Sequence, residues 1–326
     1  MMSNPIFVGP FKQEMQDFID LKKTMYKYRT VPGVLKRFDT FLAENHPSLT
    51  ILTKEAVTGW CAKTPYETIS TRNCRSSVIR QFAKYLVNIG TDAFILPHNY
   101  YSSGHKYVPH IYTEEELRLF FAETDKCHFN YWHPYRHLIM PIFFRLLLAC
   151  GLRCSEARLL KVQDVDLENG VLSILDGKNQ NDRLVPMPKS ITSRMKQYAL
   201  QVHSTSDPER YFFPALYDKP MTIGNVYRNF RRFLWKARIA HTGSGPRVQD
   251  FRHTYCVYRL RLWAEQERDL MVLIPMMSTY LGHQTFKETS YYLRLTADVF
   301  PDIRLKLERN HKDIIPDMED ILYEAD

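Results

Sequence analysis

An arginine and a glutamate interrupt an apolar stretch in the middle of the chain, which reads ACGLRCSEARLL over residues 149–160. They are Arg153 and Glu156, and they follow a helix-like run, LIMPIFFRLLLAC, after which a leucine would be the easier residue to pack. A guanidinium keeps its charge at any cellular pH and donates hydrogen bonds in a fork, so it suits an oxyanion. The ordinary alternative is an arginine that caps carbonyls behind the helix-ending glycine.

Four later stretches add residue types that can bind anions, exchange protons or act as nucleophiles. In chain order they contain Lys178 in ILDGKNQN, Gln249, Arg252 and His253 in VQDFRHTYC, His283 in YLGHQ, and Tyr291 and Tyr292 in KETSYYLRL. Taken one at a time, each has an ordinary explanation, because a lysine in a turn is usually solvated and a paired tyrosine usually packs half-buried. Their joint occurrence in one order favours a functional site.

This set of residues and its order resemble the tyrosine recombinase (phage integrase) family. In that family a GLR-x-SE turn carries the first arginine, a GK turn the lysine, an H-x-x-R box the second arginine, and an LGH turn a histidine. The nucleophilic tyrosine follows that histidine nine residues later, and nine residues after His283 comes Tyr292. The resemblance covers the chain from Thr113 to Leu295, and more loosely the helical segment before it.

The resemblance implies an enzyme that cleaves and rejoins DNA strands and needs no cofactor and no metal ion. Tyr292 would attack the scissile phosphorus and form a 3′-phosphotyrosyl link, while Arg153 and Arg252 would grip the non-bridging oxygens. Lys178 would protonate the departing 5′-oxygen, and His283 would hydrogen-bond the phosphate. The covalent link conserves the energy of the broken bond, so no ATP is required.

Three positions have supporting or open roles. Glu156 would brace a basic side chain, and His253 would support the site. Gln249 stands where the family has its usual histidine, and an amide can donate a hydrogen bond to a phosphate but cannot take up a proton. Tyr291 remains the minor alternative for the nucleophile, because neighbours on a helix point about 100° apart and only one can face the phosphate.

Charge and composition favour a nucleic-acid partner. The formal charge is +8, made of −5 over residues 297–326 and +13 over the preceding chain. We find no apolar run long enough to span a bilayer and no signal peptide at the N-terminus, so we expect a cytoplasmic protein without a membrane partner. The six cysteines lack a pairing framework, as reduced thiols do, and no metal site is expected.

The pattern of apolar residues predicts a mainly α fold with a small antiparallel β-sheet. A helical core-binding DNA-binding domain is expected over residues 1–96, and an interdomain linker over 97–112. An α+β tyrosine recombinase catalytic domain is expected over 113–296, starting at a capping box formed by Thr113 and Glu116. The acidic tail, residues 297–326, has apolar positions such as Phe300 and is expected to dock on a neighbouring protomer, with disorder as the alternative.

Two predicted helices carry basic stripes that would suit a DNA groove, although a solvated helix face is an equally ordinary meaning of such charge. The candidate DNA-binding residues are Arg72, Arg75, Arg80 and Lys84 on the first helix, and Arg228, Arg231, Arg232 and Lys236 on the second.

The sequence therefore predicts a recombinase that acts as a homo-tetramer on paired sites in double-stranded DNA, alone or with partner recombinases. Integration, excision or transposition of a mobile element is the expected role. The alternatives are a DNA-binding protein or repressor of the same fold that has lost catalysis, which Gln249 would fit, and a type IB topoisomerase-like strand transferase.

Overall fold

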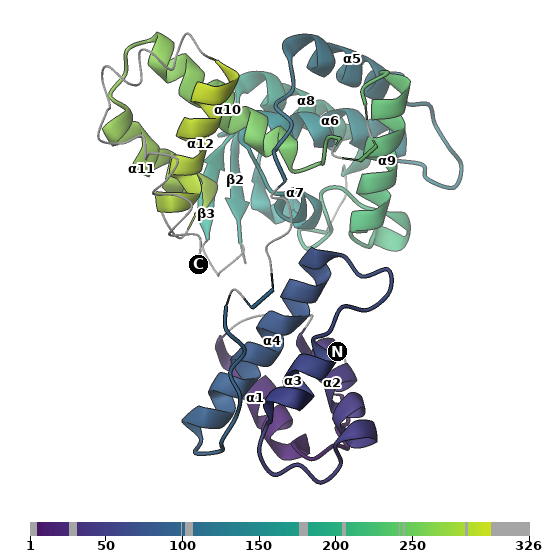
Figure 1. Ribbon diagram of the computed structural model, residues 1–326. Coiled ribbons are helices and arrows are strands. Elements are labelled where there is room, and N and C mark those ends of the chain that lie inside the picture. Colours follow the sequence, from purple (N-terminus) through teal and green to yellow (C-terminus); the bar gives the residue numbers. More distant parts are fainter. Residues whose placement is uncertain are drawn as a thin grey trace. The chain divides into compact units, whose positions relative to one another are not determined.

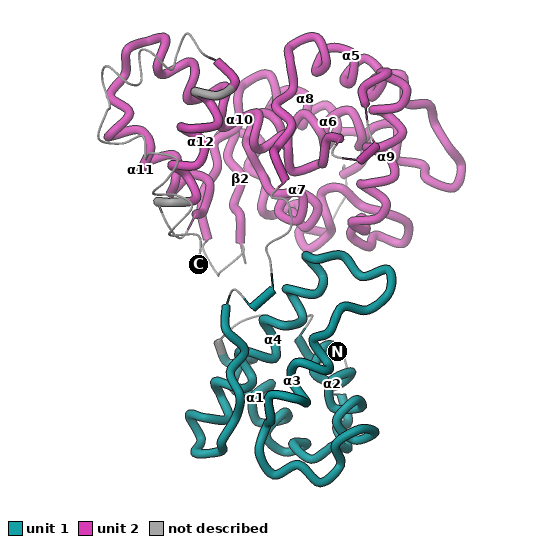
Figure 2. The backbone as a smooth tube through the Cα atoms, viewed as in Figure 1, with its two compact units in different colours: residues 1–106, 322–326 teal, residues 107–321 magenta. Residues whose placement is uncertain are grey.

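The computed structural model describes residues 5–25, 31–98, 100–101, 107–175, 182–203, 207–240, 242–243, 245–283 and 286–300. They form two compact units, one from the residues up to Tyr101 and one from Tyr107 onward, coloured teal and magenta in Figure 2. No helix in these ranges is long and apolar enough to cross a membrane. The fold is mainly helical with one three-stranded antiparallel sheet, as the sequence predicts.

The first unit is built from four helices: α1 (Lys12–Met25), α2 (Val31–Asn45), α3 (Lys54–Trp60) and α4 (Ile69–Asn88). The core of this unit includes Phe18, Leu35 and Phe82, at the helical spacing that the sequence predicts. Thr68 caps the start of α4 through its side chain, and Gly90, with φ of 87°, follows the end of that helix.

The second unit holds the remaining elements. They are α5 (Glu114–Asp125), α6 (Arg136–Cys150), α7 (Cys154–Leu159), η1 (Val162–Asp164), β1 (Val165–Asp166), β2 (Val171–Ile174), β3 (Arg183–Pro186), α8 (Lys189–Val202), η2 (Leu216–Asp218), α9 (Ile223–Lys236), α10 (Asp250–Glu265), α11 (Leu270–Leu281) and α12 (Phe286–Val299). Figure 1 shows α10 and α12 next to each other at one side of the sheet, with α5 and α9 at the far side.

The sheet has the order β1-β2-β3, and both strand pairs are antiparallel. The predicted small antiparallel sheet is confirmed, and β2 and β3 form a hairpin in it, with Val171 opposite Pro186 and Ser173 opposite Leu184. Leu172 and Ile174 point into the core, so the strand alternates as a half-buried strand should. The two-residue strand β1 was not predicted, because so short a segment has no periodicity to read.

The segment predicted as a linker is partly built into the second unit. Tyr112 is fully buried, and its N–H donates to Oγ1 of Thr254 on α10 at 3.1 Å. Tyr107 donates its hydroxyl hydrogen to the buried carboxylate of Asp250, at the start of the same helix. The residues from Tyr107 to Tyr112 are therefore anchored on α10, because they supply buried aromatic surface and hydrogen bonds there. The predicted capping box of Thr113 is confirmed.

Helix α12 extends to Val299, so the predicted domain end at residue 296 lies inside this helix. Phe300 packs in the same chain, with its ring 6.1 Å from that of Tyr258 and 4.4 Å from the guanidinium of Arg261. These contacts with α10 leave Phe300 half-buried, and its docking on a neighbouring protomer stays a prediction. The rest of the acidic tail lies outside the described residues.

Candidate active site

A left-handed glycine fixes the backbone of Arg153. Gly151 ends α6 with φ of 59°, and a Cβ there would lie 2.5 Å from the ring of Tyr255, so a larger residue would be both strained and blocked. The chain then enters α7 with Arg153 in an extended conformation at the N-cap. Its backbone N–H donates to Oε2 of Glu156 at 2.8 Å, which caps the helix and places that carboxylate against Arg153.

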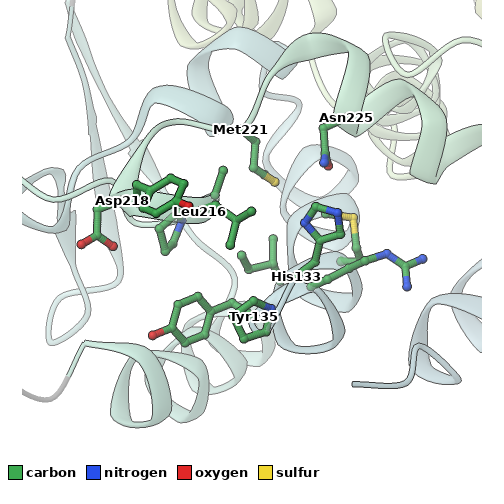
Figure 3. A pocket seen from close by; sticks show the side chains of 13 residues that line it. His133, Tyr135, Leu216, Asp218, Met221 and Asn225 are labelled. Carbon is green, nitrogen blue, oxygen red and sulfur yellow. The ribbon is translucent and has the colours of Figure 1, made fainter. Parts of the chain in front are cut away.

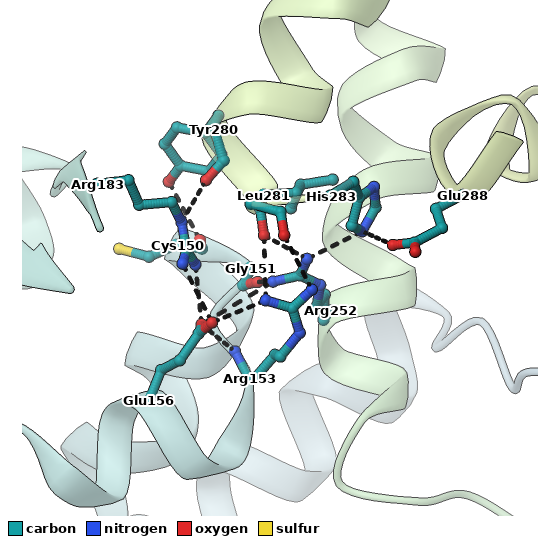
Figure 4. A network of polar contacts seen from close by, with 11 residues as sticks. Cys150, Gly151, Arg153, Glu156, Arg183, Arg252, Tyr280, Leu281, His283 and Glu288 are labelled. Carbon is teal, nitrogen blue, oxygen red and sulfur yellow. Dashed lines mark hydrogen bonds and ion pairs between the residues drawn. The ribbon is translucent and has the colours of Figure 1, made fainter. Parts of the chain in front are cut away.

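The carboxylate of Glu156 binds two arginine side chains. Oε1 accepts from Nη1 of Arg153 at 2.9 Å and from Nη1 of Arg183 at 3.1 Å, and Oε2 accepts from Nη2 of Arg183 at 2.8 Å (Figure 4). Nη1 of Arg252 lies 4.0 Å from Oε2. Burial opposes the ionised form of Glu156, but hydrogen bonds from Arg183 and Arg153 outweigh it and hold its pKa below the ordinary value. We call these three arginines and Glu156 the arginine cluster.

Three consecutive carbonyls at the end of α11 accept from the three arginines of the cluster, and the Leu281 carbonyl also accepts from Nη1 of Arg153 at 3.4 Å. The pairs are Tyr280 O with Arg183 Nε at 2.7 Å, Leu281 O with Arg252 Nη2 at 2.7 Å, and Gly282 O with Arg153 Nη2 at 3.3 Å. The C-terminal end of a helix carries partial negative charge, which favours cations at this position. Gly282 has φ of 65° and lets the chain leave α11 directly after these carbonyls.

Arg252 is the most deeply buried member of the cluster, with 2% of its side chain exposed. Besides Leu281, it donates from Nη1 to the carbonyl of Gly151 at 2.9 Å and from Nη2 to Nε2 of His283 at 3.0 Å. Burial, and then the charge of Arg153, lower the pKa of Arg252 from its very high ordinary value. Two like charges held together in the interior favour an anion as their counterpart.

His283 is a neutral imidazole at cellular pH. Burial, followed by the positive charges of Arg252 and Arg153, lowers the pKa of His283 to about 3. A guanidinium only donates, so Nε2 of His283 accepts from Arg252 and its proton is on Nδ1. Nδ1 lies 2.8 Å from Oγ1 of Thr289 on α12, and this oxygen accepts a hydrogen bond from it. The imidazole therefore joins the arginine cluster to the helix of the tyrosines.

Tyr292 lies against both histidines of the site. Its ring stacks on that of His283, with centroids 6.1 Å apart and an interplanar angle of 9°, and its centroid is 5.6 Å from that of His253. Burial and the neighbouring Cys256 raise the pKa of the Tyr292 hydroxyl above its ordinary value, while Arg252 acts in the opposite direction. Tyr291 is 38% exposed against 4% for Tyr292, so only Tyr292 lies inside the site.

The remaining predicted site residues are placed as follows. Gln249 is half-buried at the N-cap of α10, one helical turn before His253, and its side chain makes no hydrogen bond to a described residue. His253 is half-buried, its Nδ1 has no hydrogen-bond partner among the described residues, and burial lowers its pKa. Lys178 lies outside the described residues.

The basic stripe on α4 is largely occupied by contacts within its own unit. Arg75 is buried, forms an ion pair with Glu67 at 2.6 Å and donates to the carbonyl of Ala62 at 2.7 Å, so its predicted exposure is wrong. Arg72 stacks on the ring of Tyr101 at 3.3 Å and donates from Nε to the carbonyl of Cys61 at 2.9 Å. Carbonyls that helix periodicity cannot reveal attract these side chains inward.

Two further residues of this stripe differ from one another. Arg80 donates from Nε to the carbonyl of Leu96 at 2.7 Å and from Nη2 to that of Pro97 at 3.0 Å. Lys84 is exposed and makes no hydrogen bond or ion pair with a described residue. The prediction that these residues contact DNA stays a prediction, and Lys84 has the side chain best available for it.

The basic stripe on α9 is exposed. Val226, Phe230 and Phe233 face the core, as predicted, and the opposite face is polar. Its exposed basic residues are Arg228, Arg232 and Lys236, and Arg231 is half-buried beside the ring of Tyr227. DNA contact by this face stays a prediction.

A pocket in the second unit lies apart from the arginine cluster. It is lined by residues before and at the start of α6, around η2 and at the start of α9, among them His133, Tyr135, Leu216, Asp218 and Asn225 (Figure 3). None of the predicted site residues lines it, so we place the candidate active site at the arginine cluster.

Arg183 is the member of the cluster that the sequence did not reveal. It is the first residue of β3, in the run DRLVPMP, where an arginine at a strand end is ordinarily solvated. One feature of the sequence could have indicated it: Arg183 follows the candidate site residue Lys178 by only five residues. Its partners are far away in the sequence, at Glu156 and Tyr280, and only folding brings them together.

A family model for the phage integrase family matches residues 112–298, which is more than half of the chain. The chain belongs to the phage integrase family. It is 29% identical over 320 residues to "Putative integrase/recombinase y4rB" of Sinorhizobium fredii, covering 94% of this chain and 99% of that protein. It is also 29% identical over 158 residues to the tyrosine recombinase XerA of Pyrococcus furiosus, covering 47% of this chain and 49% of XerA.

Solved structures of recombinases share the fold at lower identity. The Tn1549 transposon integrase in complex with transposon right end DNA aligns with a TM-score of 0.64 and 15% identity, over 91% of this chain and 98% of that one. The XerH site-specific recombinase bound to difH substrate, in its post-cleavage complex, aligns with a TM-score of 0.61 and 18% identity, over 83% and 76%. These similarities show the tyrosine recombinase fold.

Proposed function

We propose that this protein is a site-specific recombinase that cleaves and rejoins double-stranded DNA through a covalent bond between Tyr292 and a 3′-phosphate. The observation that carries the proposal is the charge of the arginine cluster. Three guanidinium groups surround one carboxylate, and the buried Tyr292 lies next to Arg252 and His283. Such an excess of buried positive charge is stabilised by an anion, and a scissile phosphate supplies one.

The reaction that fits this arrangement is a phosphoryl transfer to tyrosine. The hydroxyl oxygen of Tyr292 bonds to phosphorus, its proton passes to water, and the bond from phosphorus to the 5′-oxygen breaks. Arg153 and Arg252 hold the non-bridging oxygens, and each donor in such a site contributes roughly 3 kcal/mol to lowering the barrier. Lys178 gives a proton to the 5′-oxygen. The reverse attack by the 5′-hydroxyl of a partner strand rejoins the DNA.

We further propose that the natural substrates are the ends of a mobile element, on which a homo-tetramer assembles, alone or with partner recombinases. The proposal is supported by the likeness to a transposon integrase bound to transposon right end DNA and by the similarity, over 94% of this chain, to a protein named "Putative integrase/recombinase y4rB". The basic face of α9 and the side chain of Lys84 on α4 would bind the DNA backbone. We also propose that the protein acts in the cytoplasm.

One observation favours a second candidate, a DNA-binding protein that does not cleave. Gln249 occupies the position of the usual histidine of the H-x-x-R box, and glutamine cannot exchange a proton. Retention of the arginine cluster, His283 and Tyr292 weighs against this candidate.

Covalent capture separates the two candidates. A nicked suicide substrate loses the short fragment after cleavage, so a covalent protein–DNA adduct accumulates only if the tyrosine attacks. We expect adduct with the wild-type chain and with Tyr291→Phe, and none with Tyr292→Phe, which should still bind the site. Adduct formation by Tyr292→Phe together with its loss in Tyr291→Phe would show that the nucleophile is Tyr291, and binding without any adduct in the wild type would favour the second candidate.

A further inference from the structure

Arg183 places every nitrogen of its guanidinium against an acceptor. Nε donates to the carbonyl of Tyr280 at 2.7 Å, and the two terminal nitrogens donate to the two oxygens of Glu156 at 3.1 and 2.8 Å. Only 8% of the Arg183 side chain is exposed. A fork that meets a carboxylate with two parallel hydrogen bonds fixes the orientation of both groups, which a lysine cannot do.

The same carboxylate determines where Arg153 points. Glu156 accepts from the backbone N–H of Arg153 at 2.8 Å and from its Nη1 at 2.9 Å. A change at Arg183 can therefore reach Arg153 through one shared carboxylate, that of Glu156. Arg183 also begins β3, so it links the strand that follows the Lys178 segment to Arg153.

A role limited to fastening β3 to α11 accounts for only part of these contacts. The hydrogen bond to the Tyr280 carbonyl would suffice for that purpose, and any long donor could make it. The fastening does not explain why both oxygens of Glu156 are bound. Arg183 also packs closely against the backbone of Gly282, since a Cβ at Gly282 would lie 3.1 Å from Nη1 of Arg183.

We propose that Arg183 is a positioning residue for the DNA cleavage described above: it holds Glu156 in the orientation that presents Arg153 to the scissile phosphate. This inference rests on the proposed function. Arg183 acts through Glu156 and Arg153, and its hydrogen bond to the Tyr280 carbonyl holds the start of β3 against the same cluster.

The position of Arg183 also predicts how its replacement changes the pH dependence of the cleavage rate. The groups that face Glu156 are Arg153 before α7, Arg183 on β3, Arg252 on α10 and His283 after α11. After burial, which acts in the opposite sense, the hydrogen bond from Arg183 is the largest influence on the pKa of Glu156. Removing this hydrogen bond should let Glu156 take up a proton at a higher pH and release Arg153.

The test measures single-turnover cleavage of the suicide substrate at saturating protein, with Arg183→Lys and Arg183→Gln. We expect cleavage slower by about tenfold to a hundredfold, the effect of a misplaced group, with site affinity within about twofold of wild type. As pH is lowered, the cleavage rate of Arg183→Gln should begin to fall at a higher pH than the cleavage rate of the wild type. The matched control is Arg158→Gln, because Arg158 donates to the carbonyl of Met221 at 2.6 Å and makes no contact with Glu156.

A double-mutant cycle separates positioning from fastening. If Arg183 acts through Arg153, the chain with both Arg153→Lys and Arg183→Lys should cleave no more slowly than the one with Arg153→Lys alone. The inference would be overturned if the rate reductions of the two single variants multiply in the double variant, or if Arg183→Lys cleaves at the wild-type rate. In either case, adduct formation by the wild type would still support the proposed function. Absence of wild-type adduct would overturn both. Thermal unfolding shows whether each variant is folded. If Arg183→Gln does not fold, the test relies on Arg183→Lys, which keeps the positive charge.

Discussion

Nη2 of Arg252 lies 3.0 Å from Nε2 of His283, so the guanidinium selects the neutral form of this imidazole. Protonation would place two donors and two charges against each other. In the folded protein the pKa of His283 falls to about 3, whereas an unfolded histidine titrates near 6.5. The unfolded chain therefore binds the extra proton first, and this group lowers the stability of the fold as pH falls below about 6.5.

This relationship predicts a pH-dependent stability difference between the wild type and His283→Gln. Relative to His283→Gln, the wild type should lose about 1 kcal/mol of unfolding free energy between pH 7.5 and 5.5. Denaturant unfolding of both proteins at both pH values measures this difference. A difference between wild type and His283→Gln that does not change with pH would mean that His283 is not held neutral by the fold.

Gln249 offers a direct comparison between an amide and an imidazole. Its side chain is half-buried and makes no hydrogen bond to a described residue, so substitutions there should preserve the fold. If glutamine donates a hydrogen bond to the phosphate, Gln249→Ala should slow cleavage, and Gln249→His should preserve or raise the rate. Cleavage of the suicide substrate measures both. Complete loss of cleavage in a folded Gln249→His protein would contradict this role.

The exposed basic face of α9 predicts a salt effect. Arg228 and Arg232 are exposed, so replacing both by alanine should change unfolding free energy by less than about 0.5 kcal/mol. If each binds a phosphate, the double variant should bind DNA more weakly, and the slope of log K against log salt should flatten by about 0.9 for each phosphate that is no longer neutralised. Binding titrations at several salt concentrations test this prediction, and an unchanged slope would show that this face is only solvated.

Arg75 and Lys84 lie on one helix but should respond differently to alanine. Arg75 is paired with Glu67, with 9% and 7% of the two side chains exposed, and this hydrogen bond is the main reason that the pKa of Glu67 falls to about 2. Arg75→Ala leaves a buried carboxylate without its partner and should cost about 3–5 kcal/mol of unfolding free energy. Lys84→Ala should leave stability unchanged and weaken DNA binding. Equal stability of the two variants would contradict the pairing.

Truncations separate the packed end of α12 from the tail beyond it. Leu295 is buried, and Oγ1 of Thr296 donates to the carbonyl of Tyr292 at 2.7 Å, so a chain ending at Leu295 would disturb the tyrosine helix itself. A chain ending at Phe300 keeps these contacts. We expect it to bind one site yet fail to form paired-site complexes, seen as a missing slow species in gel-shift experiments.

The control for that truncation removes only the last five residues, LYEAD, and should be tolerated. Normal paired-site complexes formed by the chain ending at Phe300 would show that the acidic tail has no part in assembly.

The order of most elements and the set of residues that could take part in catalysis can be read from local patterns in the sequence. Arg153, Arg252, His283 and Tyr292 stand at family spacing, and the helices, the hairpin and the cap at Thr113 follow from local patterns of period and capping. The helices, the hairpin and the cap depend on residues within a few positions of each other, and each candidate site residue stands in its own short motif. Such short-range preferences can be read without knowing the fold.

Which charged side chains contact each other could not be predicted before the fold was known. Arg75 reads as part of an exposed stripe but turns inward to Glu67, and Arg183 reads as a solvated strand end but binds Glu156 and the carbonyl of Tyr280. A buried charge goes where acceptors remain unpaired, and the acceptors of Arg183 lie 27 and 97 residues away along the chain. Period and composition record the polarity of each position, whereas the partner of a buried charge is set by the packing of distant elements.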